Sequence, residues 1–528
     1  VGNSLTGIAT VQEAVDALTS SGAQAGLFDD PIRQALAAAE DPLRRLATIS
    51  DATLDEVAEA KVATASAVDA VRPVKDVFDL IVANRLGEVS LPLELDVEKL
   101  PRVETSIAKD IGERLEVVHF PIAFPEVFLR ERGGFDVILG NPPWEKPQVE
   151  VHEFWARHFP GLRGKATAER DSLIEKYESE RPDLVAALSQ ERADALALRQ
   201  IVTSGPYDLG VGHTDLAKVF AWRFWGLIGD GGEVGVVLPR STSLFAPGMA
   251  PWRNAIIGGG GFADVCVLSN RGGWVFPTVA GNYTVVLLTA RRQRQALDQV
   301  HLDGPYSSYA GYLAGRAEGA RTIPADEFCG WPSDASFPLL PSKESVDIYR
   351  KLAKHPRLGA HPHLKFRPVQ GDVNAAADKH LFLNTEPDGA WPVYSGSSFN
   401  FWTPDTGERY AWADSEVITE YLFEKRKSQA NVKTSAFHGM PAAELDDAAT
   451  LPCRHPRIAF RDVARATDTR TCVVALIPPN VIPQHKAPYL LRRENSSRDE
   501  AFLLGLLSSR PLDWWARRHV ETTVSFRV

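Results

Sequence analysis

The sequence predicts an α/β fold followed by a second region of mixed α and β structure. Between residues 214 and 300, amphipathic helical segments alternate with short apolar runs that suit buried strands, a pattern typical of a mostly parallel sheet. From about residue 304 the sequence changes to short segments rich in Pro, Gly, His and aromatic residues. A chain of 528 residues also exceeds what one hydrophobic core usually supports, so we place a domain boundary near 300–345.

The N-terminal part predicts helices and then two short strands. Residues 9–115 are rich in Ala, Leu, Val and acidic residues, with apolar side chains at helical spacing. Examples are Val11, Ala14, Val15 and Leu18. Strands are expected over 117–120 and 135–140, the second one buried, and residues 150–205 are polar and helical again.

The next elements follow from caps and periodicity. Thr214 is the expected N-cap of a helix whose apolar face holds Leu216, Val219, Phe220, Phe224 and Leu227. Gly231-Gly232 then ends this helix, and 234–239 predicts a buried strand. The remaining expected elements are a helix over 249–257, a strand over 264–269 and a hairpin-like segment over 283–289.

The most informative stretch is Asn141-Pro142-Pro143-Trp144, directly after the second predicted strand. Two prolines stiffen the turn and remove competing N–H groups. The turn therefore suits a planar nucleobase with an exocyclic amino group. The Asn141 amide oxygen and the Pro142 carbonyl accept the two amino hydrogens, and Trp144 stacks on the ring. From these four residues alone, an ordinary Pro-Pro turn with a packed tryptophan is an equal alternative.

The net charge of −10 argues weakly against a nucleic-acid partner, but the charge is unevenly distributed. Residues 451–528 carry 13 Lys and Arg against 7 Asp and Glu, whereas residues 1–300 carry 30 against 41. The C-terminal excess is almost all arginine, which suits phosphates and guanine edges. A solvated basic face is the simpler alternative.

Neither a metal site nor a membrane segment is expected. The chain has four widely spaced cysteines, Cys266, Cys329, Cys453 and Cys472. They predict free thiols in a reducing cytoplasm, because no C-x-x-C pair is present. His355, His361 and His363 lie among prolines without a further ligand type at a usual spacing, so they predict a loop. No apolar run reaches the length of a membrane span, and no secretory signal opens the chain.

The order of these features resembles that of DNA methyltransferases that act on adenine N6 with S-adenosylmethionine. The sequence looks closest to the large fused enzymes of bacterial defence, namely type IIG restriction–modification proteins and the BREX (PglX) and DISARM methyltransferases. Residues 135–144 match the catalytic motif of this family, 215–220 the helix that follows it, and 232–239 the next strand. Residues 275–277 and 283–288 resemble the late motif whose aromatic residue faces the target base.

The resemblance implies a Rossmann-like class I methyltransferase sheet, incomplete at its N-terminus, over residues 1–8 and 116–300. Residues 9–115 and 150–205 are then helical insertions. Residues 345–528 correspond to an α+β DNA target-recognition domain, also partial.

The resemblance gives two candidate cofactor contacts. Gly2-Asn3-Ser4-Leu5 resembles the segment where a polar side chain meets the adenine of the cofactor, although that residue is commonly aspartate; a simple loop is the alternative. Asp136 is the second candidate. The glycine-rich cofactor turn has no convincing counterpart, since the run 258–261 follows a helix and predicts a flexible turn. We therefore expect these motifs to precede Val1, and the isolated chain to bind S-adenosylmethionine poorly.

The implied reaction is direct methyl transfer to a flipped-out adenine. The amino nitrogen is a poor nucleophile, and the acceptors at Asn141 and Pro142 would orient its lone pair. A base inside a duplex cannot reach such a pocket, so it must leave the stack. Trp144 and Phe276 are the candidates to stack on it, with a core role for Phe276 as the alternative.

Double-stranded DNA is the implied partner, and other subunits of a defence system are further candidates. The candidate DNA-binding residues are Arg367, Tyr394, Arg457 and Arg461, although each arginine also suits a phosphate contact or a surface charge. Two alternatives stay open: a DNA-binding specificity module without catalysis, and a methyltransferase acting on amino groups of protein or RNA. The sequence has no convincing Asp…Glu-x-Lys cluster of the kind that nucleases use, so we expect any restriction activity to lie outside it.

Overall fold

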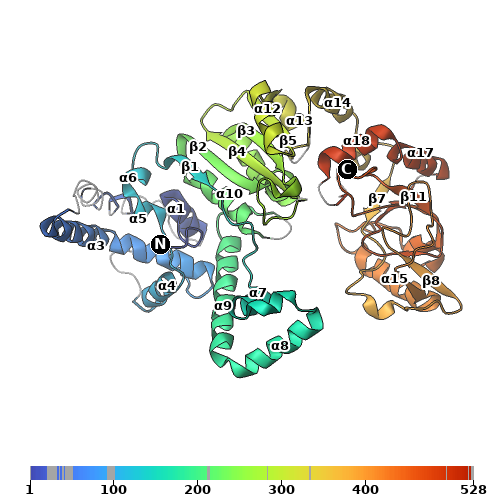
Figure 1. Cartoon of the computed structure of the whole chain (residues 1–528), viewed down its shortest axis with the longest axis horizontal. Coiled ribbons are helices and arrows are strands. Elements are labelled where there is room, and N and C mark those ends of the chain that lie inside the picture. Colours follow the sequence, from blue (N-terminus) through green and yellow to red (C-terminus); the bar gives the residue numbers. More distant parts are fainter. Residues whose placement is uncertain are drawn as a thin grey trace. The chain divides into compact units, whose positions relative to one another are not determined.

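The computed structural model describes residues 2–20, 32–34, 36–38, 41, 52–91, 102–210, 214–281, 283–331, 335–494, 496–520 and 523–524. The chain divides into two compact units (Figure 1). Unit 1 comprises Val1–Leu268, Val285–Asp303 and Leu313–Ser336. Unit 2 comprises Ser269–Thr284, Gly304–Tyr312 and Phe337–Val528. Among the described residues, no helix is long and apolar enough to cross a membrane.

Unit 1 is built around a six-stranded mixed sheet in the order β1-β2-β4-β3-β5-β6. Its strands are β1 (Phe135–Gly140), β2 (Ile228–Pro239), β3 (Gly260–Ser269), β4 (Thr284–Arg292), β5 (Gln299–Tyr306) and β6 (Arg321–Pro324). β1 runs parallel to β2, whereas β4 is antiparallel to β2 and β6 is antiparallel to β5. The sheet is therefore mixed rather than mostly parallel, and residues 284–289 lie within one strand instead of forming a hairpin by themselves. The hairpin-like segment is the reversed strand β4, because an apolar run does not reveal strand direction.

Helices surround this sheet and form separate cores beside it. They are α1 (Val11–Ser20), α3 (Leu54–Arg85), α4 (Arg102–Arg114), α5 (Phe120–Ala123), α6 (Pro125–Phe128), α7 (Val151–His158), α8 (Thr167–Glu180), α9 (Pro182–Ser204), α10 (Leu216–Leu227), α11 (Ala250–Gly258), α12 (Tyr309–Glu318) and α13 (Ala325–Gly330). The described parts of 9–115 and 150–205 are thus largely helical, as predicted. Figure 1 shows α7, α8 and α9 grouped together, and the buried Trp155 belongs to their own apolar core.

Two predicted strands differ from the structure. Residues 117–120 form no strand: Val117 makes a single bridge with Asn3, and Phe120 begins α5 because Pro121 suits a first helical turn. β1 forms as predicted but is not buried. It is the edge strand of the sheet, and Val137 and Leu139 are 67% and 86% exposed.

Two glycine predictions also fail. Gly231 and Gly232 do not end α10, which stops at Leu227; they lie inside β2, where its register with β1 shifts and Gly231 has a φ of 78°. They therefore form a bulge. Residues 259–261 of the run 258–261 form a close-packed joint between α11 and β3 rather than a flexible turn. A Cβ on Gly260 would lie 2.0 Å from the Arg291 carbonyl oxygen.

Unit 2 contains two small sheets covered by helices. A four-stranded antiparallel sheet has the order β11-β10-β13-β7, and a three-stranded sheet has the order β12-β8-β9. The strands are β7 (Phe366–Val369), β8 (Ala390–Tyr394), β9 (Ala411–Asp414), β10 (Arg457–Phe460), β11 (Val474–Ile477), β12 (Ile482–Pro483) and β13 (Tyr489–Arg492). The helices are α14 (Lys343–Ala353), α15 (Ser415–Ala430), α16 (Ala442–Leu445), α17 (Ser497–Leu507) and α18 (Arg510–His519). Residues of β10, β11 and α17 share one apolar core, which includes Ile458, Val474 and Leu503.

Three of the four cysteines are described as free thiols. Cys266, Cys453 and Cys472 are buried, and burial raises the pKa of each thiol to about 12. Each is therefore protonated and unreactive at neutral pH. The three predicted loop histidines lie between α14 and β7, where His361 Nδ1 accepts the N–H groups of His363 and Leu364.

A buried histidine joins the first residues of unit 1 to α3. His119 Nδ1 accepts the Ile8 N–H at 3.1 Å, and its Nε2 lies 2.9 Å from Asp79 Oδ1. The accepted N–H places the ring proton on Nε2, where it donates to Asp79. Burial lowers the pKa of His119 from its ordinary value of 6.5, against the raising effect of Asp79.

We expect the free energy of unfolding to fall as the pH drops below 6.5, because the unfolded chain then binds a proton that folded His119 does not. This stability is present above 6.5 and is lost toward the lower folded pKa. Urea unfolding at about pH 7.5 and pH 5.5 measures the loss, which should be smaller in His119→Gln. The exposed His152→Gln serves as the control and should keep the full loss. Equal losses in wild type and His119→Gln would contradict this assignment.

Candidate functional site

The Asn141–Trp144 turn leaves the sheet at the carboxyl edge that β1 shares with β2. The two strands are parallel, and Gly140 pairs with Val236. The segments that follow β1 and β2 therefore emerge on the same side. In open α/β sheets this edge is where ligands bind. The prolines at 142 and 143 cannot donate to a neighbouring strand, which ends the ladder at this point.

The Asn141–Trp144 turn presents the side chain of Asn141 to solvent. Asn141 and Pro143 are exposed, Pro142 is buried and Trp144 is half-buried. Within the described part of the chain, the Asn141 carboxamide makes no hydrogen bond. Its oxygen therefore remains available to an amino group of a ligand.

Helix α10 holds this turn from two places. Its first N–H group, from Leu216, donates to the Glu145 carbonyl at 2.9 Å. Further along the helix, the Phe224 ring lies so close to Gly140 that an added Cβ would meet it at 3.3 Å. The helix is capped by Asp215, whose carboxylate accepts the Lys218 N–H at 3.0 Å, so the predicted cap at Thr214 is wrong by one residue.

The same helix holds the N-terminal segment through Arg223, which is 1% exposed. The guanidinium donates to the carbonyls of Leu5 and Gly7 at 3.0 and 2.7 Å. It also lies 3.5 Å from the Glu13 carboxylate, which accepts a second arginine, Arg85, at 2.9 Å. α10 therefore fixes residues 5–7 and the turn after β1 in one body.

Asn3, a predicted cofactor contact, lies in this fixed segment. Its N–H donates to the Glu116 carbonyl at 2.7 Å, and its side-chain oxygen accepts the Leu5 N–H at 3.0 Å. Gly7 lets the segment approach closely, since a Cβ there would lie 2.0 Å from the Val118 carbonyl oxygen. The Asn3 oxygen is thus used by the chain itself. A contact of Asn3 with S-adenosylmethionine stays a prediction.

Asp136, the other predicted cofactor contact, lies near the opposite end of β1. It is five residues before Asn141, which corresponds to roughly 16 Å along a strand. It pairs with Arg130 at 3.0 Å and with Arg132. Hydrogen bonding to Arg130, with support from Arg132, lowers the pKa of Asp136. The structure does not bring Asp136 to the Asn141 turn.

The sequence did not single out two features at the carboxyl edge. Burial raises the pKa of the Asp215 carboxyl, against hydrogen bonds from the Lys218 N–H and the Thr242 side chain. Thr242 belongs to a single π-helical turn, Ser241–Phe245, directly after β2. Such turns recur at functional sites. The sequence signal was positional: an Asp at a helix start and a polar segment after the second parallel strand.

Phe276, the predicted second stacking residue, is half-buried and belongs to unit 2. Its loop is organised by Asn270, which is 0% exposed. The Asn270 amide donates to the carbonyls of Phe276 and Val279, and its oxygen accepts the N–H groups of Val275 and Phe276. Pairing of Phe276 with Trp144 stays a prediction.

Two of the four predicted DNA contacts are core residues of unit 2. Arg457 is 3% exposed, pairs with the buried Asp372 at 2.9 Å and lies 4.8 Å from the Tyr489 ring centroid. Tyr394 is 0% exposed, with the Arg409 guanidinium 5.2 Å from its ring centroid. Both side chains support the fold and offer no surface to DNA in this conformation.

The other two candidate DNA contacts, Arg461 and Arg367, are more accessible to solvent. Arg461 is half-buried and donates to the carbonyls of Gly396 and Phe399 at 2.8 and 3.3 Å. Arg367 is exposed and donates to the His438 carbonyl at 3.0 Å. Arg367 therefore remains the candidate with the greatest freedom to reach a phosphate or a base.

Comparison with known proteins finds no matching family model and no matching curated protein. The chain is similar to the solved structure of the type IIG restriction endonuclease BpuSI, with 14% identity, a TM-score of 0.29 and coverage of 94% of this chain and 57% of that chain. It is also similar to the solved structure of the type IIL restriction-modification enzyme MmeI in complex with DNA, with 11% identity and a TM-score of 0.34. This second match covers 89% of this chain and 59% of that chain. The chain thus spans less than two thirds of either protein. These distant likenesses concern the fold alone.

Replacing Arg223 should destabilise unit 1, because it leaves two buried carbonyls and part of the Glu13 charge without their partner. We expect Arg223→Leu to lower the free energy of unfolding by about 3 kcal/mol in urea titrations. Hydrogen exchange at the Ile8 and Ala9 amides should also become faster. Arg163→Leu removes an exposed ion pair with Glu153 and should cost less than about 1 kcal/mol. Similar losses in the two variants would contradict the role given to Arg223.

Proposed function

We propose that this chain is part of a site-specific DNA adenine-N6 methyltransferase of a bacterial restriction–modification or phage-defence system. One observation carries the proposal. The turn at Asn141–Trp144 lies at the carboxyl edge of two parallel strands, with the Asn141 carboxamide exposed and the Trp144 ring half-buried beside it. The resemblance of the surrounding segments to this family supports the same assignment.

The chemistry assigned to the chain is orientation of the base. The Asn141 oxygen and the Pro142 carbonyl accept the two hydrogens of the adenine amino group and turn its lone pair out of conjugation with the ring. Trp144 packs against the face of the base, which leaves the duplex to reach this turn. α10 keeps the acceptors in place, so little reorganisation is needed when the base arrives.

S-adenosylmethionine is the proposed source of the methyl group, and this part rests on the resemblance. Bound to such an enzyme, it supplies an electrophilic methyl group on a sulfonium. Among the described residues, the Asn3 side-chain oxygen accepts the Leu5 N–H, and Gly260 packs against the Arg291 carbonyl oxygen. The second candidate function is a DNA-binding specificity module that orients DNA without methylating it.

Replacing Asn141 with alanine in the full gene should abolish adenine methylation. Loss of one oriented hydrogen-bond partner costs about 100-fold or more in rate at comparable sites. Single-molecule sequencing of DNA from expressing cells detects the modified adenines. Gln148→Ala, at an exposed neighbouring position, is the matched control and should leave the methylation pattern intact.

Two outcomes would contradict this proposal. One is a methylation pattern that is unchanged in Asn141→Ala. The other is the absence of modified adenines in both wild type and variant, which would instead support the specificity module.

A further inference from the structure

Phe401 and Trp402 form the tip of a tight turn in unit 2. The Asn400 N–H donates to the Thr403 carbonyl at 2.9 Å, and the Thr403 N–H donates back at 2.8 Å. Trp402 is the second tip residue and has a φ of 57°, the left-handed region that favours Gly or Asn. A bulky aromatic residue is strained in this position. Its side chain is nevertheless 59% exposed, so core packing does not explain the strain.

Arg470 and strand β11 hold the tip in place. The Arg470 guanidinium lies 3.8 Å from the centroid of the Phe401 ring. The Phe401 and Trp402 rings meet edge to face, with centroids 6.3 Å apart and an angle of 89°. The main-chain N–H of Trp402 donates to the Val474 carbonyl on β11 at 3.4 Å. The exposed ring therefore projects from a fixed base, which lowers the entropy lost when it binds a partner.

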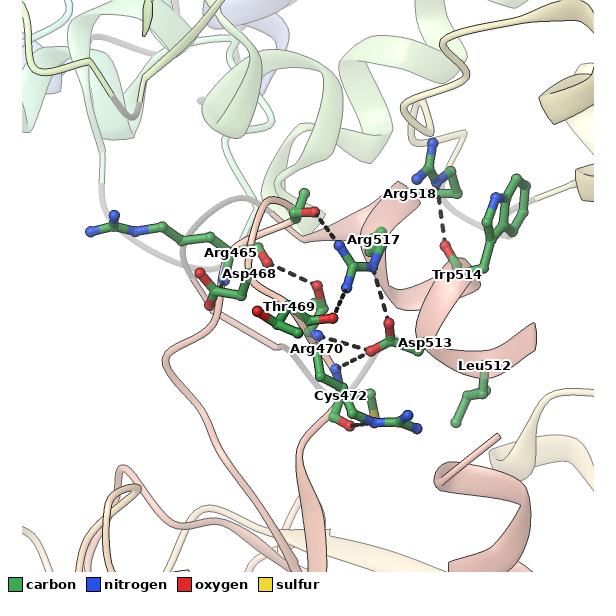
Figure 2. A network of polar contacts seen from close by, with 12 residues as sticks. Arg465, Asp468, Thr469, Arg470, Cys472, Leu512, Asp513, Trp514, Arg517 and Arg518 are labelled. Carbon is green, nitrogen blue, oxygen red and sulfur yellow. Dashed lines mark hydrogen bonds and ion pairs between the residues drawn. The ribbon is translucent and has the colours of Figure 1, made fainter. Parts of the chain in front are cut away.

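The loop that carries this arginine, residues 465–472, is itself fixed by α18 (Figure 2). Asp513 accepts the N–H groups of Thr471 and Cys472, both at 2.8 Å. Arg517 donates to Asp513 at 3.0 Å and to two carbonyls of the loop at 2.9 and 2.8 Å, as Figure 2 shows. The loop is thus fixed to α18 by hydrogen bonds, and Arg470 joins the loop to the tip through its contact with the Phe401 ring.

The arginines next to the tip donate to carbonyl groups rather than to carboxylates. Arg461 and Arg470 donate to main-chain carbonyls, and in the described part of unit 2 no carboxylate lies within 4.0 Å of either guanidinium. Arg465 is a further exposed arginine in the loop that carries Arg470. Its main-chain N–H donates to the carboxylate of the exposed Asp468. Carbonyl dipoles orient a guanidinium without cancelling its net charge.

The acidic group nearest to the tip in sequence is already neutralised. Asp405 pairs with Arg409 through both carboxylate oxygens, at 2.7 and 2.8 Å. An exposed flat ring on a tip that contacts guanidinium groups without a carboxylate partner suits a polyanion that carries flat rings. Among macromolecules, nucleic acid has both properties.

On the basis of the proposed DNA-binding function, we propose that Trp402 is a DNA-stacking residue. Its ring lies against a nucleobase of the bound duplex, either at an opened base step or on a base that has left the stack. Arg461 and Arg470 hold the tip and attract the phosphates beside it.

The test uses the full chain and a fluorescent pool of random-sequence DNA duplexes at about 50 mM salt, read by fluorescence anisotropy. Trp402→Gly removes the ring at a φ that glycine favours, so it should fold at least as well as wild type. We expect it to weaken binding roughly tenfold, in line with the loss of one base-stacking aromatic. Trp402→Tyr keeps a ring and should retain most of the affinity. Phe502→Ala, which removes another exposed aromatic of unit 2, should bind like wild type.

Equal binding by wild type and Trp402→Gly would overturn the proposal. A wild-type chain that binds no duplex would overturn it as well. The assay contains no methyl donor, so its result is independent of methyl transfer. Binding that depends on Trp402 would stand even if Asn141→Ala left methylation unchanged, which separates failure of this inference from failure of the proposed reaction.

Discussion

The hold of α10 on two distant segments is the constraint on which the candidate site depends. A helix of twelve residues spans about 18 Å and is stiff over that length. Its first N–H group is bonded to Glu145, and Phe224 packs on Gly140. Arg223 is bonded to the carbonyls of Leu5 and Gly7. The turn that follows an otherwise exposed edge strand is therefore fixed by side chains and main-chain groups of one helix.

Burying the Arg223 guanidinium group costs free energy, because its charge must be removed from water. The cost is offset by Glu13, by two carbonyls and by the aromatic ring of Tyr207, 5.4 Å from the guanidinium. The same solution appears in unit 2, where Arg457, Arg461 and Arg517 donate to main-chain carbonyls. Several arginines of the C-terminal region thus stabilise loops, so the positive charge of this region does not by itself identify DNA contacts.

The sequence predicted those elements whose signal is local. The β1 strand, the apolar face of α10, the helix near 250 and the strand that follows it all form. Strand direction was not predictable, because the apolar runs of β2 and β4 look alike although one is reversed relative to the other. The glycine run 258–261 was misjudged because its packing against the Arg291 carbonyl involves a distant strand. For the site, the turn itself was predicted and the roles of Asp215 and Arg223 were not, since each depends on tertiary contacts.

The central claim is that the Asn141 turn orients the amino group of adenine. It is tested most directly by incubating the purified full-length gene product with DNA and S-adenosylmethionine bearing a deuterated methyl group. Mass spectrometry of the released nucleosides then identifies the labelled atom. Label on the N6 amino group of adenine is the result the account predicts. Label confined to cytosine, to a protein side chain or to RNA would contradict it.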